Sequence, residues 1–121
     1  MSTIKTETLS TPSNATVPVD TVVNGTAKAW VNFNGTGTVA IRRAFNVSSI
    51  TDHGTGDYTV NFTTAMPDAN YCFQANGYTS KTFNENNSSI VRTTTAIRMA
   101  TRESSSNAFT DPAQVSVAIF R

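Results

Sequence analysis

Residues 27–34 read AKAWVNFN and residues 52–62 read DHGTGDYTVNF, and these two stretches decide the fold. In the first stretch the odd positions are apolar and the even positions are polar or carry Trp30, which is the alternation of a strand with one buried face. In the second stretch, residues that tolerate positive φ or cap their own backbone precede the alternating Tyr58, Val60 and Phe62. A β-hairpin that closes within residues 52–57 is therefore predicted.

The composition extends this β character to the whole chain. Thr occupies 21 of the 121 positions, Ser 12 and Asn 12, whereas Leu occurs only at Leu9. The best helix formers are scarce, and the bulky apolar residues are mainly branched or aromatic, which suits a pleated sheet. A formal charge of +1 without a run of like charges argues against nucleic acid or an anionic membrane as partner. Cys72 is the single cysteine and there is one histidine, so neither an internal disulfide nor a structural zinc site is expected.

Further alternating runs lie in residues 38–50, 71–76, 91–99 and 115–120. In the first of these Ile50 is out of phase, which predicts a bulge near residues 48–49. Arg43 occupies an apolar position there, so either the strand bulges or the guanidinium is paired across a subunit interface. Residues 77–89 and 101–112 are polar and are predicted to be loops. Six or seven short strands with close turns predict an all-β protein: an antiparallel β-sandwich or a closely related barrel.

The first twenty residues differ from the rest. Residues 1–20 lack the period of two and contain Pro12 and Pro18, which predicts an extended arm or linker. One β domain is predicted over residues 21–121. Apolar runs are short throughout, so neither a signal peptide nor a membrane-spanning segment is expected.

Four segments resemble one known module. Residues 28–42 (KAWVNFNGTGTVAIR), 45–62, 65–71 (AMPDANY) and 115–121 (VSVAIFR) closely resemble the C-terminal tip module of bacteriophage tail-fibre and tailspike proteins. The resemblance implies a virion protein, made in the host cytoplasm without a signal peptide, that forms an intertwined or side-by-side homotrimer at the tip of the fibre. It implies contacts with other virion tail proteins and with a host surface polysaccharide or outer-membrane receptor, and it implies neither catalysis nor a cofactor. Residues 74–107 carry no pattern of that family, as expected for a segment that differs between members.

Self-association is also favoured by the residues themselves. Several strands carry apolar or aromatic groups at both parities. Together these groups present more apolar surface than the interior of one sandwich can bury. Symmetric association would cover the remainder, and a homotrimer is expected.

Recognition is predicted in residues 78–89 and 102–110, because loops mounted on a sheet can change sequence without loss of the fold. The candidate binding residues are Tyr78, Lys81, Phe83, Asn84, Glu85, Asn87, Arg102, Glu103, Asn107 and Phe109. This mixture of amides, charges and aromatic rings suits a neutral or mildly charged glycan. The alternative is a purely structural virion protein, such as a decoration or connecting subunit, which trimerises without binding a host. A glycan-cleaving tailspike is a third class, and the sequence barely offers the carboxylate pair it needs.

Two further features have competing interpretations. Trp30 falls on the polar face of its strand and could stack on a sugar, but its place within the family resemblance favours a scaffold or subunit-contact role. Arg92, Arg98 and Arg102 share one parity and could form a basic stripe for an acidic polysaccharide. A solvated edge or interchain ion pairs would explain these arginines equally well.

The turn at residues 52–57 holds the remaining candidates. Asp52 and Asp57 bracket it and could form a glycosidase pair or a calcium site, but carboxylates that cap turn N–H groups explain both. His53 is expected to be exposed to solvent. Cys72 is expected to be a small buried or interface residue.

Overall fold

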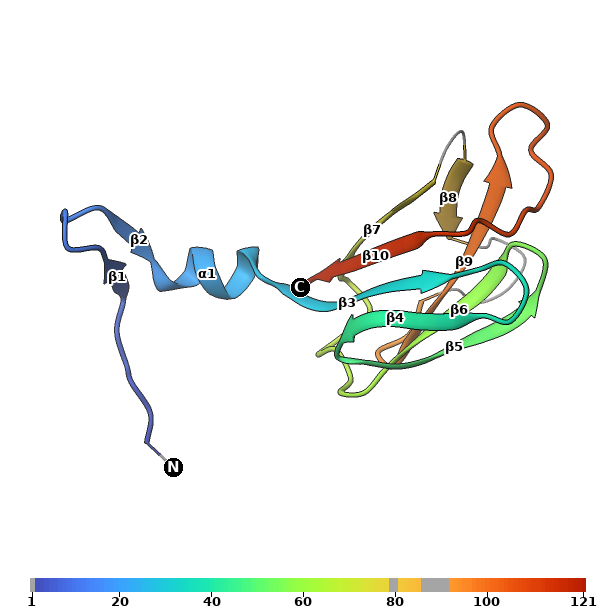
Figure 1. The fold of residues 1–121 in the computed structure, drawn as a ribbon. Coiled ribbons are helices and arrows are strands. Elements are labelled where there is room, and N and C mark those ends of the chain that lie inside the picture. The colour runs from blue at the N-terminus through green and yellow to red at the C-terminus, as the bar shows by residue number, and fades with distance from the viewer. Residues whose placement is uncertain (1, 79–80, 86–91) are drawn as a thin grey trace.

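Two four-stranded sheets and a projecting N-terminal arm make up the protein in the computed structural model, which describes residues 2–78, 81–85 and 92–121 (Figure 1). The first sheet has the strand order β4-β3-β10-β7, and the second has the order β5-β6-β9-β8. All the pairings within them are antiparallel, so the predicted all-β fold is confirmed. The strands are β3 (Ala27–Asn34), β4 (Ala40–Phe45), β5 (Val47–Gly54), β6 (Asp57–Phe62), β7 (Cys72–Gly77), β8 (Lys81–Glu85), β9 (Ala96–Glu103) and β10 (Val115–Phe120).

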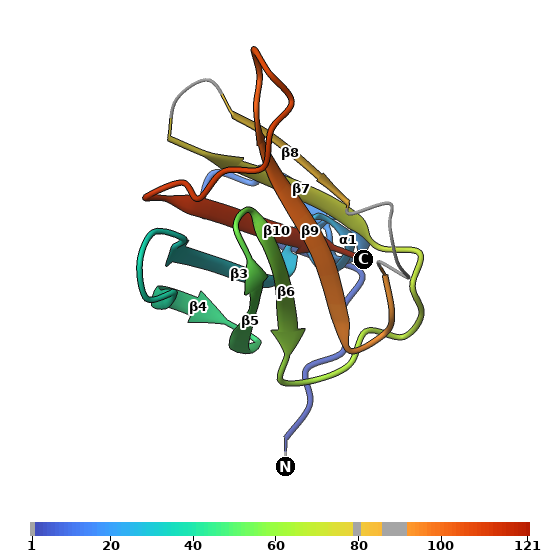
Figure 2. The ribbon, with the colours of Figure 1, turned by 90° about the vertical axis from the view of Figure 1, so that its right-hand side faces the viewer.

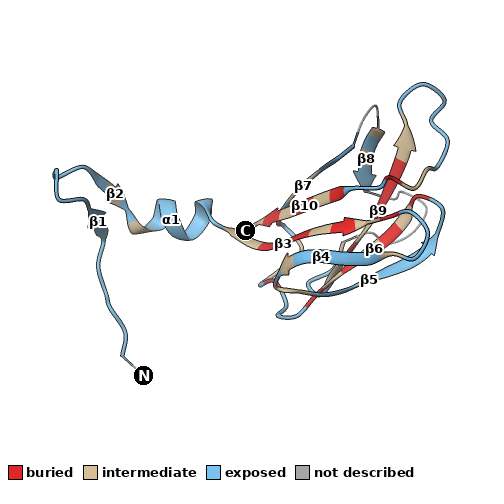
Figure 3. Cartoon of the chain, viewed as in Figure 1, coloured by how far each residue is buried: buried red, intermediate tan, exposed pale blue. Residues whose placement is uncertain are grey.

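The hydrophobic core takes side chains from both sheets, whose strands cross one another in Figure 2. In β3, β6 and β10 buried residues alternate with less buried ones, as the sequence predicts (Figure 3). The connection between β6 and β7 adds the buried Met66 and Tyr71 to the core. Phe33 of the first sheet meets Tyr58 of the second edge to face, with ring centroids 5.3 Å apart. The largest fully buried side chains are Tyr58, Tyr71, Phe33, Ile97, Met99, Ile119, Val31, Val60 and Val115, together with Thr101.

The predicted continuous strand over residues 38–50 is wrong, because the chain turns at Asn46 and passes from the first sheet to the second. Asn46 has a φ of 53°, a left-handed conformation that Asn tolerates better than most residues. Its side-chain amide donates to the carbonyl oxygens of Lys28 (3.0 Å) and Thr64 (3.2 Å), and its Oδ1 accepts the Thr64 N–H (2.7 Å). The corner is therefore held by contacts with residues distant in sequence.

Both predicted irregularities of this region are present. The β5–β6 register shifts between Val47 and Ser49, which confirms the bulge near residues 48–49. In β4, Arg43 pairs with Asn32 and Ile41 pairs with Phe33, so Arg42 is an extra residue. Of the two interpretations of Arg43, the bulge is the one observed, and the extra residue reverses the parity along the strand.

The second half of the chain departs from the predicted loops. Residues 81–85, expected within a polar loop, form β8, and β9 begins at Ala96 rather than at residue 91 and runs on to Glu103. β8 is the outer strand of the second sheet and pairs only with β9 among the described strands. The sequence of β8 shows no clear alternation of apolar and polar residues. This edge strand is stabilised by its backbone hydrogen bonds to β9 and by one inward side chain, Phe83.

The arm comprises residues 2–26 and projects from the sheets (Figure 1). It contains a hairpin of β1 (Thr8–Ser10) and β2 (Thr16–Pro18), followed by the helix α1 (Val19–Gly25). The domain boundary predicted at residue 21 falls within α1, and the first sheet begins at Ala27. A helix of seven residues is too short to show a helical period in the sequence.

Candidate functional site

The two predicted recognition segments lie side by side, because β8 pairs with β9 in the second sheet. Lys81 is the Cα partner of Glu103, and their side chains form an ion pair. This hydrogen bond from Lys81 is the main cause that lowers the pKa of the Glu103 carboxyl below its ordinary value. Residues 78–89 are therefore not one loop, since a strand divides them.

The charged and aromatic residues of the second segment also contact one another. The Arg102 guanidinium lies 3.8 Å from the centroid of the Phe109 ring and donates to the Asn107 carbonyl oxygen (3.0 Å). Asn107 has a φ of 58°, which turns the chain back so that Phe109 forms a β-bridge with Arg102. These groups, proposed from the sequence as ligand contacts, stabilise the tip of their own hairpin.

The other predicted binding residues are dispersed. Phe83 packs against the core, and a Cβ on Gly77 would collide with its ring, so the glycine makes room for it. Tyr78 (66% exposed) and Asn84 are open to solvent. Glu85 ends β8 as the Cα partner of Met99, and Asn87 lies outside the described residues. The structure thus brings Lys81 and Glu103 together, and Arg102, Asn107 and Phe109 together, whereas Phe83 packs against the core.

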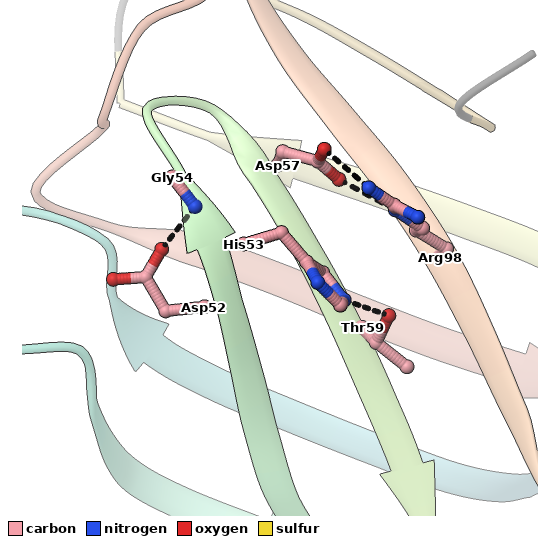
Figure 4. A network of polar contacts seen from close by, with 6 residues as sticks. All are labelled: Asp52, His53, Gly54, Asp57, Thr59 and Arg98. Atoms are coloured by element: carbon pink, nitrogen blue, oxygen red, sulfur yellow. Dashed lines mark hydrogen bonds and ion pairs between the residues drawn. The ribbon is translucent and has the colours of Figure 1, made fainter. Parts of the chain in front are cut away.

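The carboxylates of the 52–57 turn do not form a pair. Asp52 Oδ1 accepts the Gly54 N–H (2.9 Å), which is the turn-capping role, and Asp57 binds Arg98 through two contacts of 2.9 and 2.7 Å (Figure 4). His53 is exposed as expected, and its Nε2 lies 2.8 Å from Thr59 Oγ1 in a hydrogen bond. The hairpin is confirmed, and its polar residues are engaged within the sheet.

The three arginines of the predicted basic stripe also have partners within the chain. Arg98 pairs with Asp57 of its own chain, and this hydrogen bond raises the pKa of the guanidinium. Arg92 lies before β9, over the Tyr71 ring at 5.0 Å, and donates to the Tyr71 carbonyl oxygen. Arg102 stacks on Phe109. The three guanidinium groups therefore have separate local partners, and no stripe of free cations results.

A buried polar contact that the sequence did not indicate joins the two sheets. The Tyr58 hydroxyl donates to Asp111 Oδ1 (2.6 Å) and lies 3.1 Å from the Gly35 carbonyl oxygen. The same Asp111 oxygen accepts the Gly56 N–H at 2.7 Å. Burial, followed by the hydrogen bond to Asp111, strongly raises the pKa of Tyr58. In the sequence, the position of Asp111 before Pro112 was the only indication of this contact. Its role is structural, because it joins the two sheets.

A hollow lies on the outer face of the first sheet, away from the predicted loops. It has a volume of about 300 Å³ and runs along β10 between β3 and β7. Its lining residues are Trp30, Val31, Asn32, Gln74, Ala75, Asn76, Ser116, Val117 and Ala118. We call it the β10 hollow.

The register of the first sheet explains the hollow. Ala118 is the Cα partner of both Trp30 and Gln74, and Ser116 is the partner of both Asn32 and Asn76. Ala118 is therefore a small residue between two larger ones, and it forms a floor. Trp30 is 37% exposed beside it. The Asn32 amide donates to Ser116 Oγ at 2.9 Å, which fixes both side chains on the same face.

Cys72 lies at the start of β7 and is exposed, so the expectation that it is buried is wrong. It shares the outward parity of Gln74 on β7, the outer strand of the first sheet. Its Sγ lies 3.5 Å from the Gln74 amide at the margin of the hollow. Its alternative role as an interface residue stays a prediction.

No family model, curated protein or solved structure matches this chain. Across residues 2–78, 81–85 and 92–121, no group of three or more His, Cys, Asp or Glu side chains is placed to hold a metal ion. The helix found in those residues is too short to cross a membrane.

Proposed function

We propose that this chain is a virion protein, the homotrimeric β-sandwich tip of a bacteriophage tail fibre. In this proposal it attaches to a bacterial cell-surface glycan or outer-membrane component without catalysing a reaction. The observation that carries the binding role is the β10 hollow, an open concavity on regular strands whose lining offers an aromatic ring, amides and a hydroxyl. A rigid sheet that holds such groups in fixed positions suits recognition.

The resemblance supplies the class of protein. The segments that resemble phage tip modules contain β3, β5, β6 and β10 and most of β4, which are the strands that contribute most of the core. Residues 74–107, which lack the family pattern, contain most of β7 and all of β8 and β9. Of the strands that line the hollow, β3 and β10 belong to the resembling segments, and β7 adds Gln74, Ala75 and Asn76 from residues 74–107, which lack the family pattern.

The sandwich is supported by two four-stranded sheets that contribute to one core. The homotrimer is supported by the arm. α1 buries none of its residues, and Val22 and Val23 are 40% and 52% exposed. A two-turn helix has little stability alone in water, so packing of this apolar side against the same helix in other copies would stabilise it.

Adsorption competition tests the binding role. The purified chain should coat susceptible bacteria and reduce infection by a phage that carries it, while heat-unfolded protein should not. If labelled protein decorates virions but sediments with no host strain, the purely structural alternative replaces this proposal. Release of reducing sugar from host polysaccharide would instead establish a glycan-cleaving enzyme.

Light scattering tests the oligomer. The expected mass is three times that of the 13.0 kDa chain. Replacing Val22 and Val23 together by Asp should reduce the mass towards one chain, because like charges would be placed at the helix contact. A single-chain mass for the unmodified protein at micromolar concentration contradicts the trimer.

A further inference from the structure

We infer that the β10 hollow is a subsite for one pyranose ring of a neutral saccharide, with Trp30 as the surface on which the ring stacks. This inference rests on the proposed function and deepens it, because it names the ligand class and moves recognition from the loops to the sheet. The aromatic side chain, the polar groups around it, the uncharged lining and the volume of the hollow all suit such a ring.

Trp30 is held by its strand yet open to a ligand. It lies in the middle of β3, between the buried Ala29 and Val31, and keeps 37% of its surface exposed. The small Ala118 beside it leaves room for a ring to approach the indole. Phe45, 54% exposed, is the Cα partner of Trp30 on the other side and extends the aromatic surface. The C–H face of a pyranose and an aromatic face are complementary apolar surfaces.

The polar groups are placed around this surface at strand spacing. Asn32 and Ser116 form one side and are oriented by their mutual hydrogen bond. Gln74 of β7 lies across Ala118 from Trp30, and Asn76 of β7 lies beside Ser116. Amides and a hydroxyl both donate and accept, so they match sugar hydroxyl groups, which do the same. The strands fix the spacing of these side chains before the ligand binds, which lowers the entropic cost of binding.

Charge and size select the ligand. None of the nine residues that line the hollow is charged, so no group there would neutralise a carboxylate, sulfate or phosphate. A volume of about 300 Å³ is at the small end of the range for ligand sites, about 300–1,000 Å³. One sugar ring of a longer glycan would enter, while the rest of the glycan would continue over the open face.

Trp30 is the only tryptophan of the chain, so its fluorescence reports on the hollow alone. The probes are the methyl glycosides of glucose, galactose and mannose, and N-acetylglucosamine, each titrated to high millimolar concentration. At least one should give a saturable change in Trp30 emission and protect the indole from acrylamide quenching. If all four leave both signals unchanged, the inference is wrong.

Variants then assign the contacts, with binding measured by calorimetry on the best probe. Trp30→Ala should weaken binding about tenfold or more, whereas Trp30→Phe should retain most of it because a ring face is kept. Gln74→Ala should also weaken binding. His53→Ala is the matched control, since it removes an exposed ring from the second sheet, outside the hollow, and it should bind as the unmodified protein does. Equal losses for Trp30→Ala and His53→Ala would overturn the assignment.

A second copy of the chain is the other possible occupant, and the same variants distinguish it. If Trp30 is already protected from acrylamide in the unmodified protein, and Trp30→Ala lowers the mass seen by light scattering, the hollow is a subunit contact and the inference fails. The proposed function has its own test. Adsorption to bacteria without any response of Trp30 to glycosides would reject the subsite alone, whereas glycoside binding without adsorption would reject the tail-fibre role alone.

Discussion

The outer faces of the two sheets are built from similar polar residues but differ in how those residues are used. On the second sheet, the Asn61 amide donates to Ser49 Oγ (3.1 Å) and Thr51 Oγ1 (2.9 Å), and His53 bonds to Thr59. The Asp57–Arg98 ion pair completes this network across neighbouring strands (Figure 4). On the first sheet, Ala118 interrupts the pattern with a small side chain, and a hollow results.

The difference teaches that polarity on a sheet face does not by itself mark a binding site. On the second sheet, the outward side chains of neighbouring strands bond mainly to one another and leave little for a ligand. A small residue on a central strand, with larger ones on both sides, separates potential partners and exposes them.

The largest effect should come from the core that both sheets share. Phe33 is fully buried against Tyr58, so Phe33→Ala should lower the free energy of unfolding by about 3–5 kcal/mol. Trp30→Ala, which removes an aromatic side chain from the opposite face of the same strand, should cost much less. Urea unfolding of both variants measures the difference. Equal losses would show that Trp30 is part of the packed structure rather than an open surface.

The second-largest effect is expected at alkaline pH, which should weaken the contact that Tyr71 makes between the sheets. The Tyr71 hydroxyl, placed just before β7, donates to carbonyl oxygens of Thr93 (3.0 Å) and Ala96 (3.1 Å) beside β9. Burial raises the pKa of Tyr71 to about 12 from its ordinary value of 10.0, despite the opposing effect of Arg92. The folded state therefore favours the neutral phenol, and its stabilisation, complete below pH 10, is lost as the pH rises to about 12.

This loss should amount to about 2–3 kcal/mol, as a two-unit shift implies. Tyr71→Phe should be less stable at neutral pH, because its hydrogen bonds are gone, but its stability should fall less between pH 10 and pH 12. Urea unfolding at both pH values is the measurement. Parallel losses in the variant and the unmodified protein would contradict the role of Tyr71.

Host adsorption should depend on the outer face of the first sheet and not on that of the second sheet. Ala118→Leu fills the floor of the hollow and should weaken host adsorption about tenfold, which corresponds to about 1.4 kcal/mol. Thr59→Leu is the matched enlargement on the outer face of the second sheet and should leave adsorption unchanged. Dose curves in the competition assay compare them. A greater loss for Thr59→Leu would reverse the assignment of the two faces.

The smallest effect is expected within the network of the second sheet. Asp57→Asn removes the ion pair with Arg98, which is partly exposed to solvent, so the melting temperature should fall slightly and the difference should shrink in high salt. Adsorption should not change. A loss of adsorption in this variant would mean that the second sheet also contacts the host.

Local sequence features predicted the parts of the fold that depend on local geometry. Alternation placed β3, β6, β7 and β10, because side chains on a strand point to opposite faces with a period of two. Turn residues placed the β5–β6 hairpin, and a break in phase at Ile50 placed the bulge. These signals come from neighbouring residues and need no knowledge of the partner strand.

The candidate site depended on neighbours that only the fold supplies. The ten predicted recognition residues rest on the premise that a polar, irregular sequence is free to bind a ligand. In the structure, Lys81 and Glu103 bind each other, and Arg102 stacks on Phe109. The hollow joins Trp30, Gln74 and Ala118, whose separation in the sequence gave no reason to group them. The alternation of β3 indicated that Trp30 faces outward, but it did not indicate which residues of other strands surround it.

The sequence by itself thus determined an all-β chain and which face of its main strands is buried, since composition and alternation are properties of short segments. Only the tertiary structure decided that the chain changes sheets at Asn46, that Tyr58 binds Asp111, and that Ala118 opens a hollow beside Trp30. The physical reason is that strand register and sheet order are set by contacts between distant residues. The energy of those contacts depends on the whole packed arrangement rather than on any one segment.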